Sequence, residues 1–324
     1  QTALDLLGDP ADAAAQVEAA RVLTGIAWVR FLRGQFVEAR ETCDAARDYA
    51  EQTDAVIELG AAENLLGGIC YRQGDWTSAL HHTMRAMTLR EQVGYTCGAA
   101  SSMSNLGVLA VSAGHWDRAR SFFERSLELR REMGDVEGVV ILHNNLGTLA
   151  RQQGQLDAAE SHYRESLDLA EPFEIGFHIG NSAVGLARVL LMKGACDAAQ
   201  DVLATVFSQA EAIEAQDLMA EAHQVQALLL LDQSKWDQAT EEAKHSAALA
   251  AGSGNLGLET AAWRVASQVE LERGDLGAAR EALTQARRAL TDVTDQLETG
   301  RVAALAGRVA LAEGRVAEAQ SELG

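Results

Sequence analysis

Residues 144–167, NNLGTLARQQGQLDAAESHYRESL, decide the fold of this chain. A close variant, SNLGVLAVSAGHWDRARSFFERSL, occupies residues 104–127, forty residues earlier. Both copies place apolar residues at helical spacing on each side of a central glycine, Gly154 or Gly114. A glycine between two helical patterns indicates a tight turn, because glycine adopts a left-handed backbone at low energetic cost. The stretch therefore predicts a helical hairpin.

The same hairpin pattern recurs every 40 residues along the chain. A turn residue is followed two positions later by a bulky or apolar residue and five positions later by alanine. The turn positions hold Gly34, Gly74, Gly114, Gly154, Gly194, Ser234, Gly274 and Gly314. The bulky positions hold Phe36, Trp76, Trp116, Leu156, Cys196, Trp236, Leu276 and Val316, and the alanines run from Ala39 to Ala319. Eight copies without drift predict a stack of hairpins in which each contacts its neighbours.

The composition favours helix throughout. The chain has 324 residues, of which 48% are hydrophobic and only two are proline, and alanine is abundant. No β-branched run supports a strand, so we expect an all-α fold. Pro172 falls where the second helix of the fourth hairpin should finish, and we expect a local irregularity there.

The repeat resembles the tetratricopeptide repeat (TPR). The family pattern L-G-x2-Y followed by A-x3-F maps onto three copies in this chain. These are Leu146, Gly147, Ala150, Ala159 and Tyr163; Leu106, Gly107, Ala110, Ala119 and Phe123; and Leu66, Gly67, Cys70, Ala79 and Thr83. The last four copies keep the turn and the alanine but lose the Leu-Gly pair. The resemblance implies a right-handed α-α superhelix of about eight hairpins.

The 40-residue unit is longer than the usual TPR of about 34 residues. This long form resembles the arrays of Pins-type spindle-orientation adaptors. It also resembles the C-terminal sensor arrays of bacterial signal-transduction ATPases and transcription regulators. We expect one solenoid over residues 1–324, with residues 1–9 forming the tail of a preceding helix and the last repeat incomplete. The chain is then a piece of a larger multidomain protein, with an ATPase or DNA-binding domain as the expected neighbour.

The charge balance narrows the classes of partner. The chain carries 27 basic and 47 acidic residues, a net charge of −20. Such an acidic chain argues against nucleic-acid backbones and anionic membranes as partners of this segment. Its four cysteines form no CxxC pair, and neither a signal peptide nor a membrane-spanning run is present. We therefore expect a cytoplasmic protein.

A search for chemistry finds no catalytic constellation, so we expect no enzyme, no cofactor and no metal site. The segment 252–257, GSGNLG, matches G-x-G-x-x-G but follows a helical pattern instead of a strand, which indicates a turn. His143 and His223 occupy a repeat position held by Met103 and Trp263 elsewhere, which indicates core packing. Cys43, Cys70 and Cys196 are expected to act as small hydrophobic residues, and Cys97, at a helix start, is expected to be mildly reactive at most.

The informative signal lies on the first helix of each hairpin, which lines the concave groove in TPR proteins. Five lining positions stand 13, 10, 6, 3 and 2 residues before each turn and form one helical stripe. These positions hold seven arginines and three acidic residues, which reverses the balance of the whole chain. The predicted groove residues are Trp28, Phe31, Asn64, Tyr71, Arg72, Asn105, Asn144, Asn145, Arg151, Gln152, Asn181, Arg188, Arg264, Arg301 and Arg308.

We read the groove as a binding surface for a protein or peptide segment with an apolar anchor and acidic residues. Asparagine can hold a peptide backbone through both amide functions, and arginine binds carboxylates. In the competing interpretation, the aromatic residues pack beneath a missing repeat and the arginines pair locally with glutamates. A second function is a small-molecule inducer sensor with its pocket near Trp28, Tyr71 and Arg72. A deep pocket in the first three repeats would favour that function, and an open trough would not.

Overall fold

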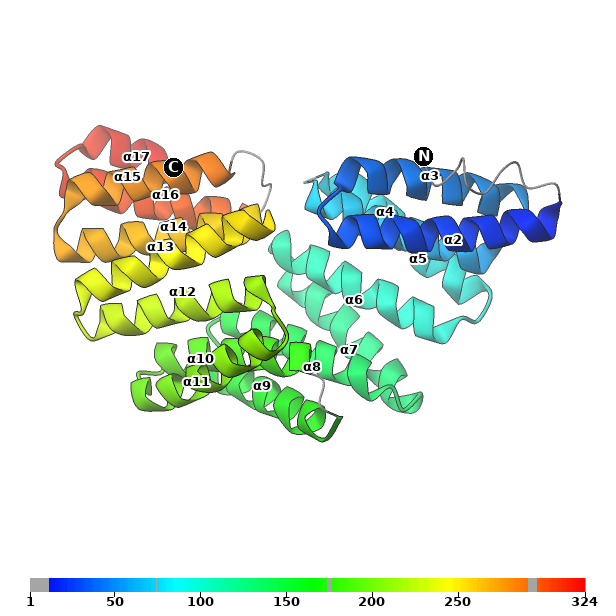
Figure 1. The fold of residues 1–324 in the computed structure, drawn as a ribbon, viewed down its shortest axis with the longest axis horizontal. Coiled ribbons are helices and arrows are strands. Elements are labelled where there is room, and N and C mark those ends of the chain that lie inside the picture. Colours follow the sequence, from blue (N-terminus) through cyan, green and yellow to red (C-terminus); the bar gives the residue numbers. More distant parts are fainter. Residues whose placement is uncertain (1–11, 74, 174–175, 291–295, 324) are drawn as a thin grey trace. The chain divides into compact units, whose positions relative to one another are not determined.

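The computed structural model describes residues 12–73, 75–173, 176–290 and 296–323. Within these ranges the chain forms α-helices, one short 3₁₀ turn and no strand, which confirms the all-α prediction (Figure 1). Residues 1–9, with the predicted helix tail, lie outside the described residues, as does the turn position Gly74. The first helices of the hairpins are α2 (Ala13–Leu32), α4 (Val56–Arg72), α6 (Thr96–Ser112), α8 (Val136–Gln152), α10 (Gly176–Met192), α12 (Gln216–Asp232), α14 (Leu256–Arg273) and α16 (Gln296–Ala312). The second helices are α3 (Phe36–Gln52), α5 (Trp76–Gln92), α7 (Trp116–Glu132), α9 (Leu156–Ala170), α11 (Cys196–Ala212), α13 (Trp236–Ser253), α15 (Leu276–Leu290) and α17 (Val316–Leu323).

Each second helix begins at the bulky residue that the repeat pattern marks. The turn before it is left-handed, with φ near +73° at Gly34, Gly114 and Gly154. Ser234 also adopts φ of +58°, so the one serine among the turn positions keeps the same backbone. The left-handed turn is therefore fixed by the hairpin geometry, and glycine is its least strained occupant.

The alanine after each turn marks the closest approach of the two helices in a hairpin. Its side chain is fully buried in the first seven copies and 1% exposed at Ala319. Close packing between the two helices also explains the glycine of the Leu-Gly pair. A Cβ atom on Gly107 would lie 2.3 Å from Cε1 of Phe123, and one on Gly147 would lie 3.0 Å from Cδ1 of Tyr163. Glycine is required there because the aromatic ring of the second helix occupies the space that a side chain would need.

The hairpins divide into two compact units, Gln1–Asp135 and Val136–Gly324. We call them unit 1 and unit 2. Unit 1 contains the hairpins α2/α3, α4/α5 and α6/α7, and part of its core gathers around Leu23, Leu66 and Ile69. Unit 2 contains the hairpins from α8/α9 to α16/α17, and its largest core cluster extends from Ala150 to Leu229.

The predicted irregularity at Pro172 is present. Helix α9 ends at Ala170, and a 3₁₀ turn, η1 (Glu171–Phe173), contains the proline. The GSGNLG segment is a helix-to-helix turn, as expected. Gly254 ends α13 with φ of +73°, and Asn255 caps α14 by accepting a hydrogen bond from the backbone N–H of Leu258. Among the described helices, none combines the length and the apolar character needed to cross a membrane.

Candidate functional site

The predicted aromatic and asparagine residues of unit 1 surround one pocket of about 350 Å³. Helices α2, α4 and α6 supply most of its wall, because the lining positions of successive first helices lie next to each other. The residues that line it include Trp28, Phe31, Asn64, Tyr71, Arg72 and Asn105, together with Val108 and Leu109. The structure thus brings together all six of the groove residues predicted in unit 1.

Aromatic contacts form the apolar side of this pocket. Trp28 stacks on Phe31 with ring centroids 5.5 Å apart, and the Trp28 side chain is 50% exposed. Tyr71 meets Trp76 edge to face at 5.1 Å, and its hydroxyl lies 3.2 Å from the Ser112 hydroxyl. A half-exposed tryptophan held by a stacked partner offers apolar surface with little remaining side-chain freedom.

A polar edge borders the same pocket. The Asn64 Oδ1 atom accepts hydrogen bonds from Ser102 Oγ and from Asn105 Nδ2, both at 3.2 Å. The acceptor side of Asn64 is therefore engaged, and its Nδ2 group makes no hydrogen bond within the described residues. The buried Arg90 holds Ser102 by donating to its hydroxyl at 2.8 Å. This chain of contacts fixes Asn64 so that it presents an amide donor to the pocket.

Arg72 lies at the rim of the pocket. Its guanidinium stands 5.4 Å from the centroid of the Phe36 ring, which is a cation–π contact. It forms no ion pair with a carboxylate in the described part of the chain. The pocket therefore combines an apolar floor, one amide donor and one positive charge.

Two further hollows among the described residues of unit 1 were not expected from the sequence. One, of about 510 Å³, lies between α5, α6 and α7 and is lined by Trp76, Leu80, Met84 and Phe122, among others. Leu80 and Met84 are nearly half exposed. A comparison of repeat copies would have found them, because the same positions hold Arg120 and Glu124 in the next repeat.

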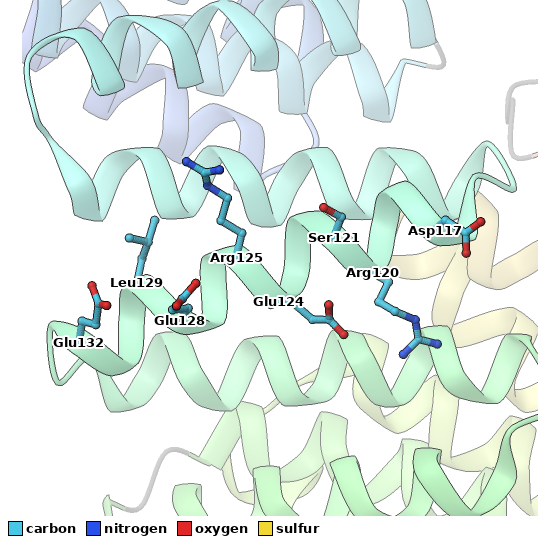
Figure 2. Close-up of a pocket in the computed structure, with 8 residues that line it drawn as sticks. All are labelled: Asp117, Arg120, Ser121, Glu124, Arg125, Glu128, Leu129 and Glu132. Carbon is cyan, nitrogen blue, oxygen red and sulfur yellow. The ribbon is translucent and has the colours of Figure 1, made fainter.

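The other hollow, about 670 Å³ in volume, is a trough along α7 (Figure 2). Figure 2 shows Arg120 and Arg125 extending to opposite sides of the helix. The described residues that line it all belong to α7: Asp117, Arg120, Ser121, Glu124, Arg125, Glu128, Leu129 and Glu132. Four of them are acidic and one is apolar. A face of this kind is a solvated surface, and it offers no apolar anchor for a ligand.

In unit 2 the predicted arginines fall into two groups. Arg264, Arg301 and Arg308 pair with nearby glutamates. The Arg264 guanidinium contacts Glu298, Arg301 lies 3.1 Å from the same residue, and Arg308 lies 2.6 Å from Glu272. For these three residues the structure matches the competing interpretation of local ion pairs, so their positive charges are largely compensated.

Arg151 and Arg188 form the second group. Arg188 donates to Gln224 Oε1 at 2.5 Å, and its nearest carboxylate, Glu221, is 3.7 Å away. The pKa of Arg188 is lowered to about 10, chiefly by burial, with repulsion from Arg151 and Arg264 added and attraction to Glu221 opposing the shift. Arg188 therefore carries a charge that its surroundings compensate only in part.

Arg151 makes no hydrogen bond or ion pair within the described residues, and its Nε atom is buried. Two neighbouring polar atoms on the stripe are also buried without a partner, Gln152 Oε1 and Gln224 Nε2. Buried polar atoms in folded proteins are nearly always hydrogen-bonded, so such a group calls for an explanation.

The predicted asparagines of unit 2 are half-buried at Asn144, Asn145 and Asn181. Asn144 Nδ2 donates to Ser182 Oγ at 3.1 Å, and Ser182 also contacts the Ser166 hydroxyl at 2.8 Å.

Two features of unit 2 were missed by the sequence prediction. One is Gln224, although it occupies a lining position. The other is a cluster of His143, His162 and Glu165 inside the hairpin α8/α9. His143 is 2% exposed, as expected for a core histidine, but it contacts other titratable groups.

Several solved structures share this fold. A Rap conjugation gene regulator of the plasmid pLS20, in complex with the Phr* peptide, is 17% identical with a TM-score of 0.70, over 86% of this chain and 73% of that chain. Aspartyl phosphate phosphatase F from Bacillus subtilis is 10% identical with a TM-score of 0.71, over 86% of this chain and 71% of that chain. A signal transduction ATPase with numerous domains and a TPR sensor, from Pyrococcus horikoshii, is 12% identical with a TM-score of 0.59, over 99% of this chain and 50% of that chain.

At these identities the likeness shows the fold alone. No curated protein sequence matches the chain. The family model of the MalT-like TPR region matches residues 15–323. This match covers nearly the whole sequence and agrees with the repeat that the turn and alanine positions define. The chain therefore belongs to the MalT-like TPR region family.

Proposed function

We propose that this chain is the sensor or scaffolding module of a cytoplasmic multidomain regulator and that it captures a protein or peptide segment on the first helices of its hairpins. The segment carries an apolar anchor and acidic residues. Binding is its role, and catalysis is not. A neighbouring ATPase or DNA-binding domain in the longer protein would change its activity when the segment binds to the hairpins.

The poorly compensated charge at Arg151 and Arg188 is the observation that carries this proposal. Two arginines on one stripe repel each other, and burial of Arg188 adds a desolvation cost. A ligand carboxylate or another anion would offset this repulsion and desolvation. Its hydrogen bonds to the arginines would be strong, because a charge-assisted hydrogen bond is stronger where water is excluded. The net charge of −20 makes such a positive site unusual for this chain.

The pocket of unit 1 suits the apolar part of the segment. Trp28 and Tyr71 offer rigid aromatic surface, and the Asn64 amide can donate to a backbone carbonyl of an extended peptide. Aromatic residues and arginine are the residue types that most often dominate binding energy at interfaces. Within unit 1, this pocket is therefore the expected contact for an apolar anchor.

The structural neighbours give support at the level of the fold. One is a regulator in complex with the Phr* peptide, another is a Rap protein complexed with competence and sporulation factor, and a third is an ATPase with a TPR sensor. One neighbour is named a phosphatase, so the fold does not by itself decide between binding and catalysis. The absence of enzymatic activity therefore stays a prediction.

A selection from a random-peptide display library tests the proposal. We expect the selected peptides to contain one aromatic or large aliphatic residue together with aspartate or glutamate. The variant Arg151→Glu should bind them at least about tenfold more weakly, because it replaces an attraction by a repulsion. Arg164→Glu is the matched control, since Arg164 lies on α9, is 55% exposed and already pairs with Glu160. Peptides that bind Arg151→Glu as tightly as the wild type would refute the acidic site.

One observation favours the second candidate function, a small-molecule inducer sensor. The pocket of about 350 Å³ in unit 1 lies within the size range of drug-like ligand sites, roughly 300–1,000 Å³. We expect Trp28→Ala to abolish any thermal shift caused by such a ligand. A metabolite that stabilises the wild type and not this variant would favour the sensor over peptide capture.

A further inference from the structure

Three positions inside the hairpin recur every 40 residues and hold titratable side chains in alternate repeats. One lies on the first helix and two lie on the second helix, 19 and 22 residues later. The three sets are Glu63, His82 and Arg85; His143, His162 and Glu165; and His223, Glu242 and His245. Five of the eight histidines in the chain occupy these positions. The hairpins between them carry mainly apolar or neutral residues there, such as Ala183, Val202 and Thr205.

The set in the hairpin α4/α5 is an ion-pair cluster, and its Arg85 also pairs with Glu51 outside the set. Glu63 is fully buried, and its carboxylate accepts a hydrogen bond from Arg85 Nη1 at 2.6 Å. His82 Nδ1 contacts the other oxygen of Glu63 at 2.6 Å. In this hairpin the cation that balances the carboxylate comes from the chain itself, as Arg85.

The set in the hairpin α12/α13 is joined differently. His223 Nδ1 contacts Glu242 Oε2 at 2.5 Å, and the rings of His223 and His245 stack with centroids 4.2 Å apart. The carboxylate here engages one imidazole, and the second imidazole packs on the first. This set is therefore held together by a hydrogen bond and a ring stack.

The set in the hairpin α8/α9 has two imidazoles and one carboxylate, with no arginine at the three positions. His143 Nδ1 and His162 Nδ1 face each other at 3.3 Å, and His143 Nε2 lies 3.5 Å from Glu165 Oε1. One ligand atom from each residue falls within 4.8 Å of the others. Two nitrogens bound to one tetrahedral zinc ion at 2.0–2.1 Å stand about 3.3 Å apart, which is the separation of the two Nδ1 atoms.

We propose that His143, His162 and Glu165 form a binding site for a divalent cation of the zinc class. Imidazole is a ligand for zinc, copper and nickel, whereas magnesium and calcium prefer sites made wholly of oxygen. His143 is 2% exposed and holds one wall of the site rigidly, while the Glu165 side chain is 48% exposed. The carboxylate can therefore turn onto the ion as the third ligand, and water completes the coordination.

Such an ion would link α8 to α9 within one hairpin, where Arg85 links α4 to α5 through Glu63 in the earlier repeat. In the hairpin α8/α9 the cation would be a metal ion that can exchange with solvent. In the hairpin α4/α5 the cation is the side chain of Arg85, which belongs to the chain. This hairpin also carries Asn144 and Arg151 on its first helix. The proposal does not depend on peptide capture, because its residues lie outside the five lining positions.

Titration of the chain with Co²⁺ tests the site, because tetrahedral Co²⁺ absorbs visible light and zinc displaces it. The protein is purified without a histidine tag and treated with a chelator first. We expect one equivalent of Co²⁺ to bind with a tetrahedral spectrum and Zn²⁺ to abolish that spectrum. His162→Gln and Glu165→Gln should each weaken binding by about tenfold or more, as losses near a metal commonly do.

His82→Gln is the matched control, since His82 occupies the same repeat position in a hairpin whose cation is Arg85. It should bind Co²⁺ as the wild type does. His162 and Glu165 are partly exposed, so their variants are expected to fold, and far-UV circular dichroism checks this. The proposal is overturned if the wild type binds neither ion, or if folded His162→Gln and Glu165→Gln bind as tightly as the wild type. Equal loss in His82→Gln would overturn it as well, because it would locate the ion elsewhere.

Discussion

The first helices of unit 1 and unit 2 use the same repeat positions for different chemistry. In unit 1 these positions build a pocket with Trp28, Phe31 and Tyr71 as its apolar part. In unit 2 they hold Arg151 and Arg188, whose charges are poorly compensated. The backbone is the same in both, because turns and alanines keep a 40-residue period. The scaffold therefore sets where a lining side chain lies, and each repeat sets its chemistry independently.

The largest expected effect tests whether the two units are separate bodies. Phe123→Ala in unit 1 and Tyr163→Ala in unit 2 should each lower the free energy of unfolding by roughly 3–5 kcal/mol, because each removes a ring that is 1% exposed. Hydrogen exchange measured by mass spectrometry should place the loss of protection in the unit that carries the substitution. Loss of protection in the same helices for both variants would contradict a division into two units. Trp28→Ala, at a half-exposed site, should change the free energy of unfolding by less than about 1 kcal/mol.

A second, smaller effect sharpens the contrast in charge. The double variant Arg188→Met with Gln224→Leu should raise the free energy of unfolding by roughly 1–2 kcal/mol, since it replaces a poorly compensated buried charge and its hydrogen-bond partner by apolar groups. The same variant should lose binding of acidic peptides. Thermal denaturation followed by circular dichroism measures the stability. A lower melting temperature would mean that Arg188 serves the fold and not a ligand.

The smallest expected effect concerns ionic strength. Binding of the selected acidic peptides should weaken by about threefold to tenfold between 0.05 and 0.5 M salt, because salt screens the attraction to Arg151 and Arg188. Fluorescence anisotropy at several salt concentrations measures this dependence. The variant Arg151→Glu should lose this salt dependence, because its attraction to the acidic residues is gone. A salt dependence that is unchanged in Arg151→Glu would separate the arginines from the binding site.

The fold could be predicted from the sequence because packing repeats at a fixed period. Ala159 and Gly154 are required by helix contact and turn geometry, and both requirements are visible in one sequence read against itself. The unit 1 pocket was also predictable, since Trp28, Asn64 and Tyr71 share neighbouring lining positions. Spacing within each helix, combined with the 40-residue repeat, was enough to place these residues on one surface.

The polar contacts between adjacent first helices of unit 2 could not be predicted from spacing within one helix. Arg308 and Glu272 are 36 residues apart, as are Arg188 and Gln224. This spacing is one repeat less about one helical turn, and it places two side chains face to face on adjacent first helices. A search at 36 residues would have found these pairs. The His143 cluster needed a different comparison, between the two helices of one hairpin, where partners are 19 residues apart.

Tyr163 has a consequence for movement between neighbouring hairpins. Its ring occupies space that a Cβ atom would fill on Gly147 of its own hairpin and on Gly185 of the next, and its hydroxyl lies 2.9 Å from the Thr148 hydroxyl. The ring is therefore packed against both hairpins. The hairpins α8/α9 and α10/α11 can rotate only slightly relative to each other before one of these two contacts opens or becomes too close. A ligand that displaces one of these hairpins would therefore displace the other with it.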